Sequence, residues 1–200
     1  MVPFDPAGLI AVLGGREAAI QRLDAFFRKE DGNWAVTKSG PLHAELDNEP
    51  SIAAPWLYNF VGQPWKTQAT VRQAMKQIWT NAPEGMPGND DLGQMSSWYV
   101  WSALGLYPVY PGRADLVIGS PLFPEAVIER PGAKITITAN GAAMDAPFVQ
   151  GLKVNGKASE ESWLPASFVQ KGGSLDFTVG SEHNPQWGSA TVPPSYGPSP

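Results

Sequence analysis

The sequence contains no cysteine, so the chain forms no disulfide and offers no thiolate for catalysis or metal binding. It has 14 lysines and arginines against 19 aspartates and glutamates, and the basic residues form no cluster of the kind that binds nucleic acids. No apolar run approaches the ~20 residues of a membrane-spanning helix. The start, Met1–Asp5, lacks the charged and apolar regions of a signal peptide. The composition therefore predicts neither a nucleic-acid nor a membrane partner, and the chain as given carries no export signal.

Glycine, proline and tryptophan are abundant instead. The 21 glycines and 20 prolines predict many fixed turns and loops. The eight tryptophans are expected mainly in a core, although an indole ring also stacks on the apolar face of a sugar. With 200 residues, of which 42% are hydrophobic, the chain can bury one sizeable core, or one core with a small appended sheet.

Helical patterns precede strand patterns along the chain. Helical composition and spacing predict helices over residues 7–13, 16–27, 54–60, 67–79 and 94–104. Thr67 is the expected N-cap of the fourth of these helices. Short runs typical of strands follow at 116–118, 126–129, 134–139, 148–154 and 174–179.

This segregation of helices and strands indicates an α+β fold. We assign residues 1–112 to a helical part and 113–190 to an antiparallel β region. Residues 191–200 are rich in proline, serine and glycine and are expected to form a disordered tail.

The stretch from Gly88 to Pro108 contains two adjacent carboxylates, Asp90 and Asp91, followed by an almost wholly apolar helix. Asp91 lies close to the expected helix N-terminus, where unpaired N–H groups favour a carboxylate. An all-apolar helix is buried, so the loop delivers both carboxylates to an aromatic-rich interior. From the residues alone two interpretations stay open: a helix cap beside a solvated aspartate, which is slightly favoured, and an acid–base pair.

A second polar stretch lies in the expected loop between residues 31 and 51. His43, Glu45, Asp47, Asn48 and Glu49 fall within seven positions. Carboxylate and amide oxygens are the ligands that calcium prefers. The spacing does not match an EF-hand, however, and the residues alone favour a solvated loop.

Several long segments, taken together, resemble glycoside hydrolase family 92, the calcium-dependent exo-acting α-mannosidases. The resemblance is carried by Gly88–Pro108 and by the segments 48–51, 55–60, 62–68 and 119–123. It implies that the chain is the C-terminal part of such an enzyme and supplies the last helices of a partial (α/α)6 barrel and a closing β region. Met1 is then expected to mark a truncation or a misassigned start.

The resemblance also implies an inverting hydrolysis of terminal α-mannosides, and mannose-containing glycans as partners. Asp91 or Asp90 is the implied general base, and Asp91 is favoured. Asn48 and Glu49 are the implied calcium ligands, and we add Glu45 and Trp98 as candidates for binding substrate. The family's general-acid glutamate motif has no counterpart in the chain, so the chain alone is expected to be inactive or weak, and the missing N-terminal part is a possible partner.

Two departures from the family pattern affect the site: Asp47 replaces the glycine before Asn48, and Ile52 and Ala53 follow the serine where histidines are common. The alternative interpretation is a non-catalytic carbohydrate-binding or structural remnant module. An unrelated helical-barrel glycosidase or lyase is a weaker third interpretation. By analogy with the family, the complete enzyme is expected to be secreted or periplasmic.

Overall fold

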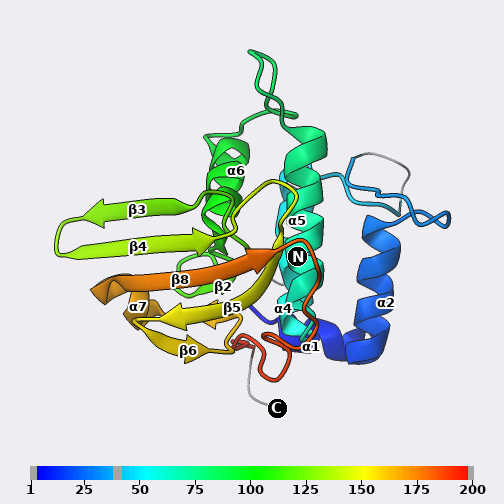
Figure 1. Cartoon of the computed structure of the whole chain (residues 1–200). Coiled ribbons are helices and arrows are strands. Elements are labelled where there is room, and N and C mark those ends of the chain that lie inside the picture. The colour runs from blue at the N-terminus through cyan, green and yellow to red at the C-terminus, as the bar shows by residue number, and fades with distance from the viewer. Residues whose placement is uncertain (1–3, 38–41, 198–200) are drawn as a thin grey trace.

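The computed structural model describes residues 4–37 and 42–197. Apart from one short helix that lies among the strands, its helices gather on one side and its larger β-sheet on the other, which confirms the α+β class (Figure 1). The helices that precede the sheets are α1 (Pro6–Val12), α2 (Arg16–Phe27), α3 (Glu49–Ile52), the short 3-10 helix η1 (Ala54–Trp56), α4 (Leu57–Phe60), α5 (Pro64–Ile78) and α6 (Gln94–Leu104). Within the described part of the chain, no helix is both long and apolar enough to cross a membrane.

Local chemistry sets the ends of these helices. The Asp5 side chain accepts a hydrogen bond from the Gly8 N–H and caps α1, with a proline at its first turn. Helix α5 begins at Pro64, so the prediction that Thr67 is its N-cap is wrong. The Thr67 hydroxyl is buried and donates instead to the Pro55 carbonyl at 2.9 Å.

The strands form two sheets. Strands β1 (Leu106–Tyr107), β2 (Leu116–Ile118) and β7 (Trp163–Leu164) form an antiparallel three-stranded sheet. The larger sheet has the order β3-β4-β8-β5-β6. Its strands are β3 (Glu125–Arg130), β4 (Ala133–Asn140), β5 (Phe148–Val154), β6 (Lys157–Ser159) and β8 (Gly173–Gly180).

The larger sheet is mixed, so the prediction of a purely antiparallel β region is wrong. Strand β8 inserts between β4 and β5 and pairs in parallel with β4 and antiparallel with β5. A parallel pair needs a long crossover connection. Here the chain between β4 and β8 runs through the β5–β6 hairpin, β7 and the short helix α7 (Ala166–Lys171).

Buried polar side chains join the helices to the sheets. The Asn59 amide on α4 donates to the carbonyls of Ile118 and Ser162, at 2.9 and 3.0 Å. Arg72 on α5 is 3% exposed, and its guanidinium donates to the main-chain carbonyls of Ala143, Ser120 and Pro121. These side chains reach from the helices to main-chain carbonyls on the sheet side, most of them buried, so the two layers pack in a fixed orientation.

The last described residues lie against the first ones. Residues 191–197 belong to the segment predicted as a disordered tail. The Tyr196 N–H donates to the Phe4 carbonyl at 2.8 Å, and the Arg113 guanidinium lies 3.6 Å from the centre of the Tyr196 ring. The Tyr110 hydroxyl donates to the Pro194 carbonyl. These contacts place 191–197 beside the segment that follows β1.

Candidate active site

The loop that carries Asp90 and Asp91 enters α6 through an uncommon backbone conformation. Three consecutive residues, Asp91, Leu92 and Gly93, have φ angles of 44°, 61° and 86°. Only glycine adopts this left-handed region without cost, and the strain at the other two residues is of order 1–2 kcal/mol each. Strained non-glycine residues concentrate at functional sites, where the surrounding structure holds them. The feature therefore marks this loop as a candidate site.

Asp90 is the carboxylate that caps helix α6. Its Oδ1 accepts hydrogen bonds from the Ser96 N–H at 3.0 Å and from the Ser96 hydroxyl at 2.7 Å. Its main-chain carbonyl accepts a further bond from the Met95 N–H. The hydrogen bonds from Ser96 hold the pKa of Asp90 below its ordinary value, because they stabilise the ionised form. The structure thus gives the capping role to Asp90, not to Asp91.

Asp91 is left exposed at the mouth of the loop. Its main-chain carbonyl accepts a bond from the Gln94 N–H, but its carboxylate has no hydrogen-bond or ion-pair partner in the described part of the chain. The left-handed backbone at Asp91 turns the chain at this point. The two aspartates are therefore chemically different: one is tied to the helix and the other is free to act on a ligand.

The aspartate loop touches the other predicted motif. A methyl group added at Gly88 would lie 2.2 Å from the Asp47 carbonyl oxygen, so the two loops are in direct contact. Helix α3, which begins at Glu49, packs on α6, and the Trp98 indole N–H donates to the Ile52 carbonyl at 2.8 Å. The structure therefore brings together the segments predicted to hold calcium and the general base.

The oxygen atoms of the 47–49 segment suit a calcium ion in kind. Oδ1 of Asp47 is buried and has no hydrogen-bond partner, which is an unusual and costly state for a carboxylate oxygen. The Asn48 side chain accepts from the Glu49 N–H at 3.1 Å, and Glu49 is half-buried in the first turn of α3. Within residues 4–37 and 42–197, no group of three His, Asp or Glu side chains is arranged to hold a metal. The segment thus offers the kinds of oxygen that calcium prefers, and one of them, Oδ1 of Asp47, has no partner.

A hollow of about 500 Å³ opens beside these residues, between α3, α6 and the segment 107–113. Polar side chains on its wall include Glu49 of α3 and Gln94 and Ser97 of α6. Because the Asp91 carbonyl caps the Gln94 N–H, the aspartate loop borders the same end of α6. The hollow therefore lies beside both motifs, with Glu49 in its wall and the aspartate loop at the adjoining end of α6.

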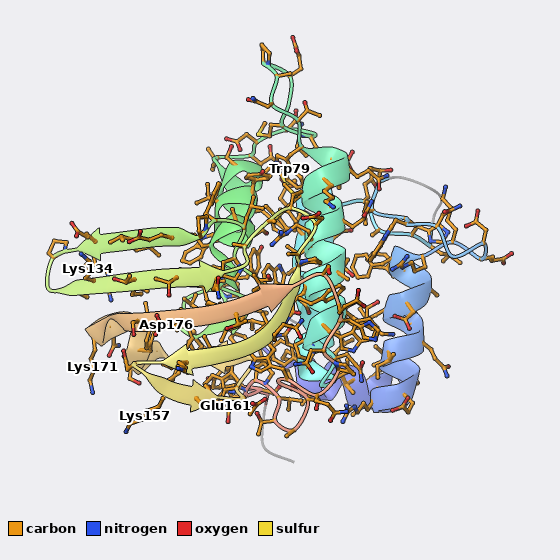
Figure 2. All side chains as sticks on the ribbon, viewed as in Figure 1. Trp79, Lys134, Lys157, Glu161, Lys171 and Asp176 are labelled. Carbon is orange, nitrogen blue, oxygen red and sulfur yellow. The ribbon has the colours of Figure 1, made fainter. Side chains whose placement is uncertain are left out.

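Of the two residues predicted to bind substrate, Trp98 lines the hollow and Glu45 does not. Trp98 is 1% exposed and stacks on Trp79, with ring centres 4.8 Å apart. Figure 2 shows Trp79 at the junction of α5 and α6. This placement favours a core role for Trp98 over a sugar platform. Glu45 is half-buried with a partner of its own, and it is not among the described residues that line the hollow.

Sequence reasoning missed Ser96, which decides which aspartate is free. A serine in the first turn of a helix has many roles, and only the left-handed backbone at residues 91–93 brings it back onto Asp90. The spacing of six residues between them is not a known capping pattern. The pairing of Ser96 with Asp90 therefore follows from the backbone conformation and could not be read from the residue types.

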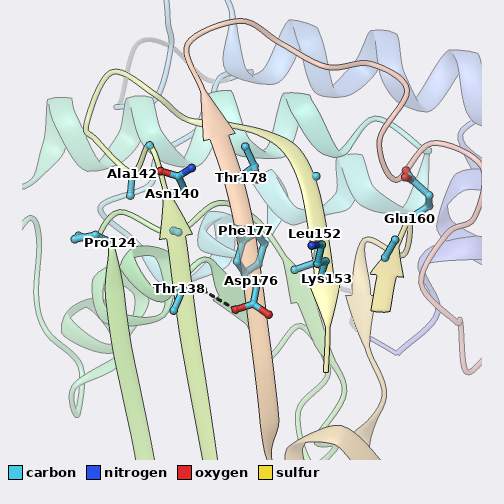
Figure 3. A pocket seen from close by; sticks show the side chains of 14 residues that line it. Pro124, Thr138, Asn140, Ala142, Leu152, Lys153, Glu160, Asp176, Phe177 and Thr178 are labelled. Atoms are coloured by element: carbon cyan, nitrogen blue, oxygen red, sulfur yellow. Dashed lines mark hydrogen bonds between the residues drawn. The ribbon is translucent and has the colours of Figure 1, made fainter. Parts of the chain in front are cut away.

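A second hollow, of about 680 Å³, lies over the open face of the larger sheet (Figure 3). Thr138 of β4 donates a hydrogen bond of 2.7 Å to Asp176 of β8, as Figure 3 shows. The wall consists mostly of small and hydroxyl side chains together with Lys153 and Glu160. No predicted site residue lines this hollow.

Comparison with known proteins agrees with these motifs. Residues 1–181 match the model of the glycosyl hydrolase family 92 catalytic domain. A protein of Arthroderma benhamiae named as an uncharacterized secreted glycosidase is 32% identical over 202 residues, covering 98% of this chain and 24% of its own length.

Solved structures give the same picture. A family 92 α-mannosidase of Bacteroides thetaiotaomicron in complex with mannoimidazole is 32% identical, with a TM-score of 0.85 over 96% of this chain and 26% of its own. A family 92 inverting mannosidase of the same organism is 34% identical, with a TM-score of 0.84 over 98% of this chain and 28% of its own. The chain thus spans about a quarter of the length of the relatives it matches.

Proposed function

Because the chain belongs to glycosyl hydrolase family 92, we propose that it carries the general-base side of the active site of an inverting α-mannosidase. One observation carries this proposal: Asp90 caps α6 and leaves Asp91 exposed, without a partner, beside the predicted calcium segment. The relatives that are α-mannosidases, one of them in complex with mannoimidazole, support mannose-containing glycans as the substrate class.

Asp91 acts as the general base in this proposal. Inverting hydrolysis requires a carboxylate that removes a proton from water on one face of the sugar, while an acid protonates the leaving oxygen on the other. A base must be ionised and must reach the water. Asp91 is exposed and its oxygens are unengaged, whereas both bonds from Ser96 occupy Oδ1 of Asp90. Asp90 is therefore a positioning residue that anchors the loop.

Calcium is the proposed cofactor, held by Asn48 and Glu49 with an oxygen of Asp47. The orphaned Asp47 Oδ1 supports this assignment, because a bound cation would satisfy it. Calcium would contact two neighbouring hydroxyls of the reacting mannose and favour distortion of its ring. Glu49 borders the hollow and lies in the segment that Gly88 contacts, which supports a site where the sugar, the calcium and the base are neighbours.

The general acid is proposed to lie outside this chain, as does the rest of the (α/α)6 barrel. General acid assistance is worth about 10²–10⁴-fold. The chain alone is therefore expected to cleave only mannosides whose leaving group needs no proton. By analogy with the secreted glycosidase it resembles, the complete protein is proposed to be exported.

Two substrates that differ only in leaving group test this proposal. The purified chain is incubated with dinitrophenyl α-mannoside and with methyl α-mannoside, each with calcium or with a chelator. We expect calcium-dependent release of dinitrophenol and no release of methanol. Equal rates of hydrolysis of the two substrates would contradict the proposal that the general acid lies outside this chain. Absence of any turnover by a folded sample would favour the non-catalytic carbohydrate-binding or structural module.

Calcium binding is tested separately from turnover. Because a ligand that binds only the folded state stabilises it, calcium is expected to raise the melting temperature of the chain. Glu49→Gln removes one proposed ligand and should remove most of this increase. Glu84→Gln, in the exposed loop before Asp90, is the matched control and should leave it unchanged. An increase that survives Glu49→Gln would place calcium elsewhere.

A further inference from the structure

A small polar hollow lies between α2, α4 and the first two turns of α5, far along the chain from the aspartate loop. Its volume is about 250 Å³. Charged and aromatic side chains dominate its wall: Asp24, Arg28, Trp34, Tyr58, Trp65 and Lys66. The aspartate loop follows the opposite end of α5, so this hollow is separate from the proposed active site (Figure 1).

One carboxylate in the hollow is fully engaged. The Lys66 ammonium donates to both oxygens of Asp24, at 2.8 and 2.6 Å, and the Tyr58 hydroxyl donates to Asp24 Oδ1 at 2.8 Å. Burial, together with the neighbouring Asp24 charge, raises the pKa of Tyr58, so this hydroxyl stays a donor at all ordinary pH values. Asp24 therefore neutralises Lys66 and has little capacity left for Arg28.

Among the described residues, Arg28 makes no hydrogen bond or ion pair with a carboxylate, and the charge of Asp24 acts on it only at longer range. Its guanidinium lies 3.3 Å from the centre of the Trp34 ring, and its Nη1 donates to the Gly32 carbonyl at 3.1 Å. These two contacts fix the plane of the group, because Arg28 and Trp34 also pair across a β-bridge. No residue in the described part of the chain accepts a hydrogen bond from the Nε–Nη2 edge. The charges on the wall sum to +1, from Arg28 and Lys66 against Asp24.

We propose that this hollow binds a small organic carboxylate of monosaccharide size, whose two oxygens pair with the free edge of Arg28. A planar guanidinium edge matches a carboxylate with two parallel hydrogen bonds. The guanidinium is already held by Trp34, so little side-chain freedom is lost on binding. The aromatic walls lower the local dielectric and strengthen the ion pair. The volume of about 250 Å³ matches one small molecule of monosaccharide size.

Calorimetric titration of the purified chain with sodium D-glucuronate, acetate and neutral glucose tests this site. We expect glucuronate to bind and glucose not to bind, because only the former carries a carboxylate. Acetate distinguishes a simple acid from a sugar acid. If acetate binds as tightly as glucuronate, the site recognises the carboxylate alone; tighter binding of glucuronate shows that the walls contact the sugar.

Variants assign the binding to Arg28. Arg28→Gln should weaken glucuronate binding at least about tenfold, the loss expected for a pair of charge-assisted hydrogen bonds. Arg28→Lys keeps the charge but loses the planar edge, so its affinity for glucuronate should lie between those of the parent and Arg28→Gln. Arg130→Gln, at the end of strand β3, is the matched control and should bind like the parent. Melting curves check that each variant is folded.

Three results would overturn the proposal. Glucose and glucuronate binding alike would show that charge is not recognised. Unchanged binding in a folded Arg28→Gln would place the ligand elsewhere. No binding of either acid to the folded parent would leave Arg28 as a purely structural contact of Trp34. None of these outcomes bears on mannoside turnover, so this site and the proposed function fail independently.

Discussion

The strained entry to helix α6 leads to a prediction about Leu92. This side chain is fully exposed, at 109% of its reference area, so it buries nothing. Its φ of 61° lies in the left-handed region. Replacing it with glycine removes the conformational strain and removes no packing. Leu92→Gly therefore isolates the cost of the backbone conformation that presents Asp91.

The expected gain is the difference between two terms. Relief of the left-handed conformation contributes about 1–2 kcal/mol. Glycine has more freedom in the unfolded chain, which costs about 0.5–1 kcal/mol. The free energy of unfolding should therefore rise by about 0.5–1 kcal/mol. For a chain of this size that corresponds to an increase in melting temperature of about 1–4 °C.

Thermal unfolding followed by circular dichroism measures this change. Val12→Gly is the matched control, because Val12 is also an exposed apolar residue, at 85%, but it ends a regular helix. There the glycine should destabilise by about 0.5 kcal/mol. Changes of opposite sign in the free energy of unfolding of the two variants would support backbone strain at Leu92. A Leu92→Gly variant that melts as low as Val12→Gly would refute the reasoning.

Three further predictions concern the loop and the packing around it. Ser96→Ala should raise the pKa of Asp90 in a carboxylate NMR titration. A carboxylate whose pKa is lowered by folding stabilises the folded state, and this stability is lost as the pH falls through that pKa. The variant should therefore lose less stability on acidification than the parent chain. Arg72→Met should destabilise by about 3 kcal/mol in urea unfolding, because the buried Ser120 and Pro121 carbonyls lose the Arg72 donor and the half-buried Ala143 carbonyl loses one of its two donors. Gly105→Ala should cost more than Gly112→Ala; both have left-handed φ, but only Gly105 lacks room for a methyl group.

Each of these has an outcome that would contradict it. An unchanged Asp90 titration in Ser96→Ala would mean that the bond from the Ser96 hydroxyl to Asp90 does not persist in solution. Lys76→Met, on the exposed side of α5, is the control for Arg72→Met, and similar losses in the two would deny Arg72 a specific role. Equal costs at Gly105 and Gly112 would show that the contact with Pro121 relaxes easily.

Helix α6 was predictable because its signals are local. Its mostly apolar sequence runs from Gln94 to Leu104, and Gly105 ends the helix in the left-handed conformation that glycine favours. Strand positions were predictable for the same reason, since alternation shows which residues face inward. The Asn155-Gly156 pair also forms the turn of the β5–β6 hairpin.

Features that depend on distant partners were not predictable. Alternation in β8 identifies a strand, but it does not reveal that the strand pairs in parallel with β4. The start of α5 was misjudged because Thr67 looks like a cap, whereas its hydroxyl serves Pro55 in the core. In the candidate site, the residues identified both aspartates, but the assignment of Asp90 to the cap required the backbone angles that bring Ser96 to it.

Turnover by two single variants tests the central claim most directly. Dinitrophenyl α-mannoside is hydrolysed with calcium by the parent chain, by Asp91→Asn and by Asp90→Asn, each first shown to be folded. The account predicts that Asp91→Asn abolishes turnover without lowering the melting temperature, and that Asp90→Asn retains part of it. Turnover that survives Asp91→Asn and disappears in a folded Asp90→Asn would contradict the assignment of Asp91 as the base.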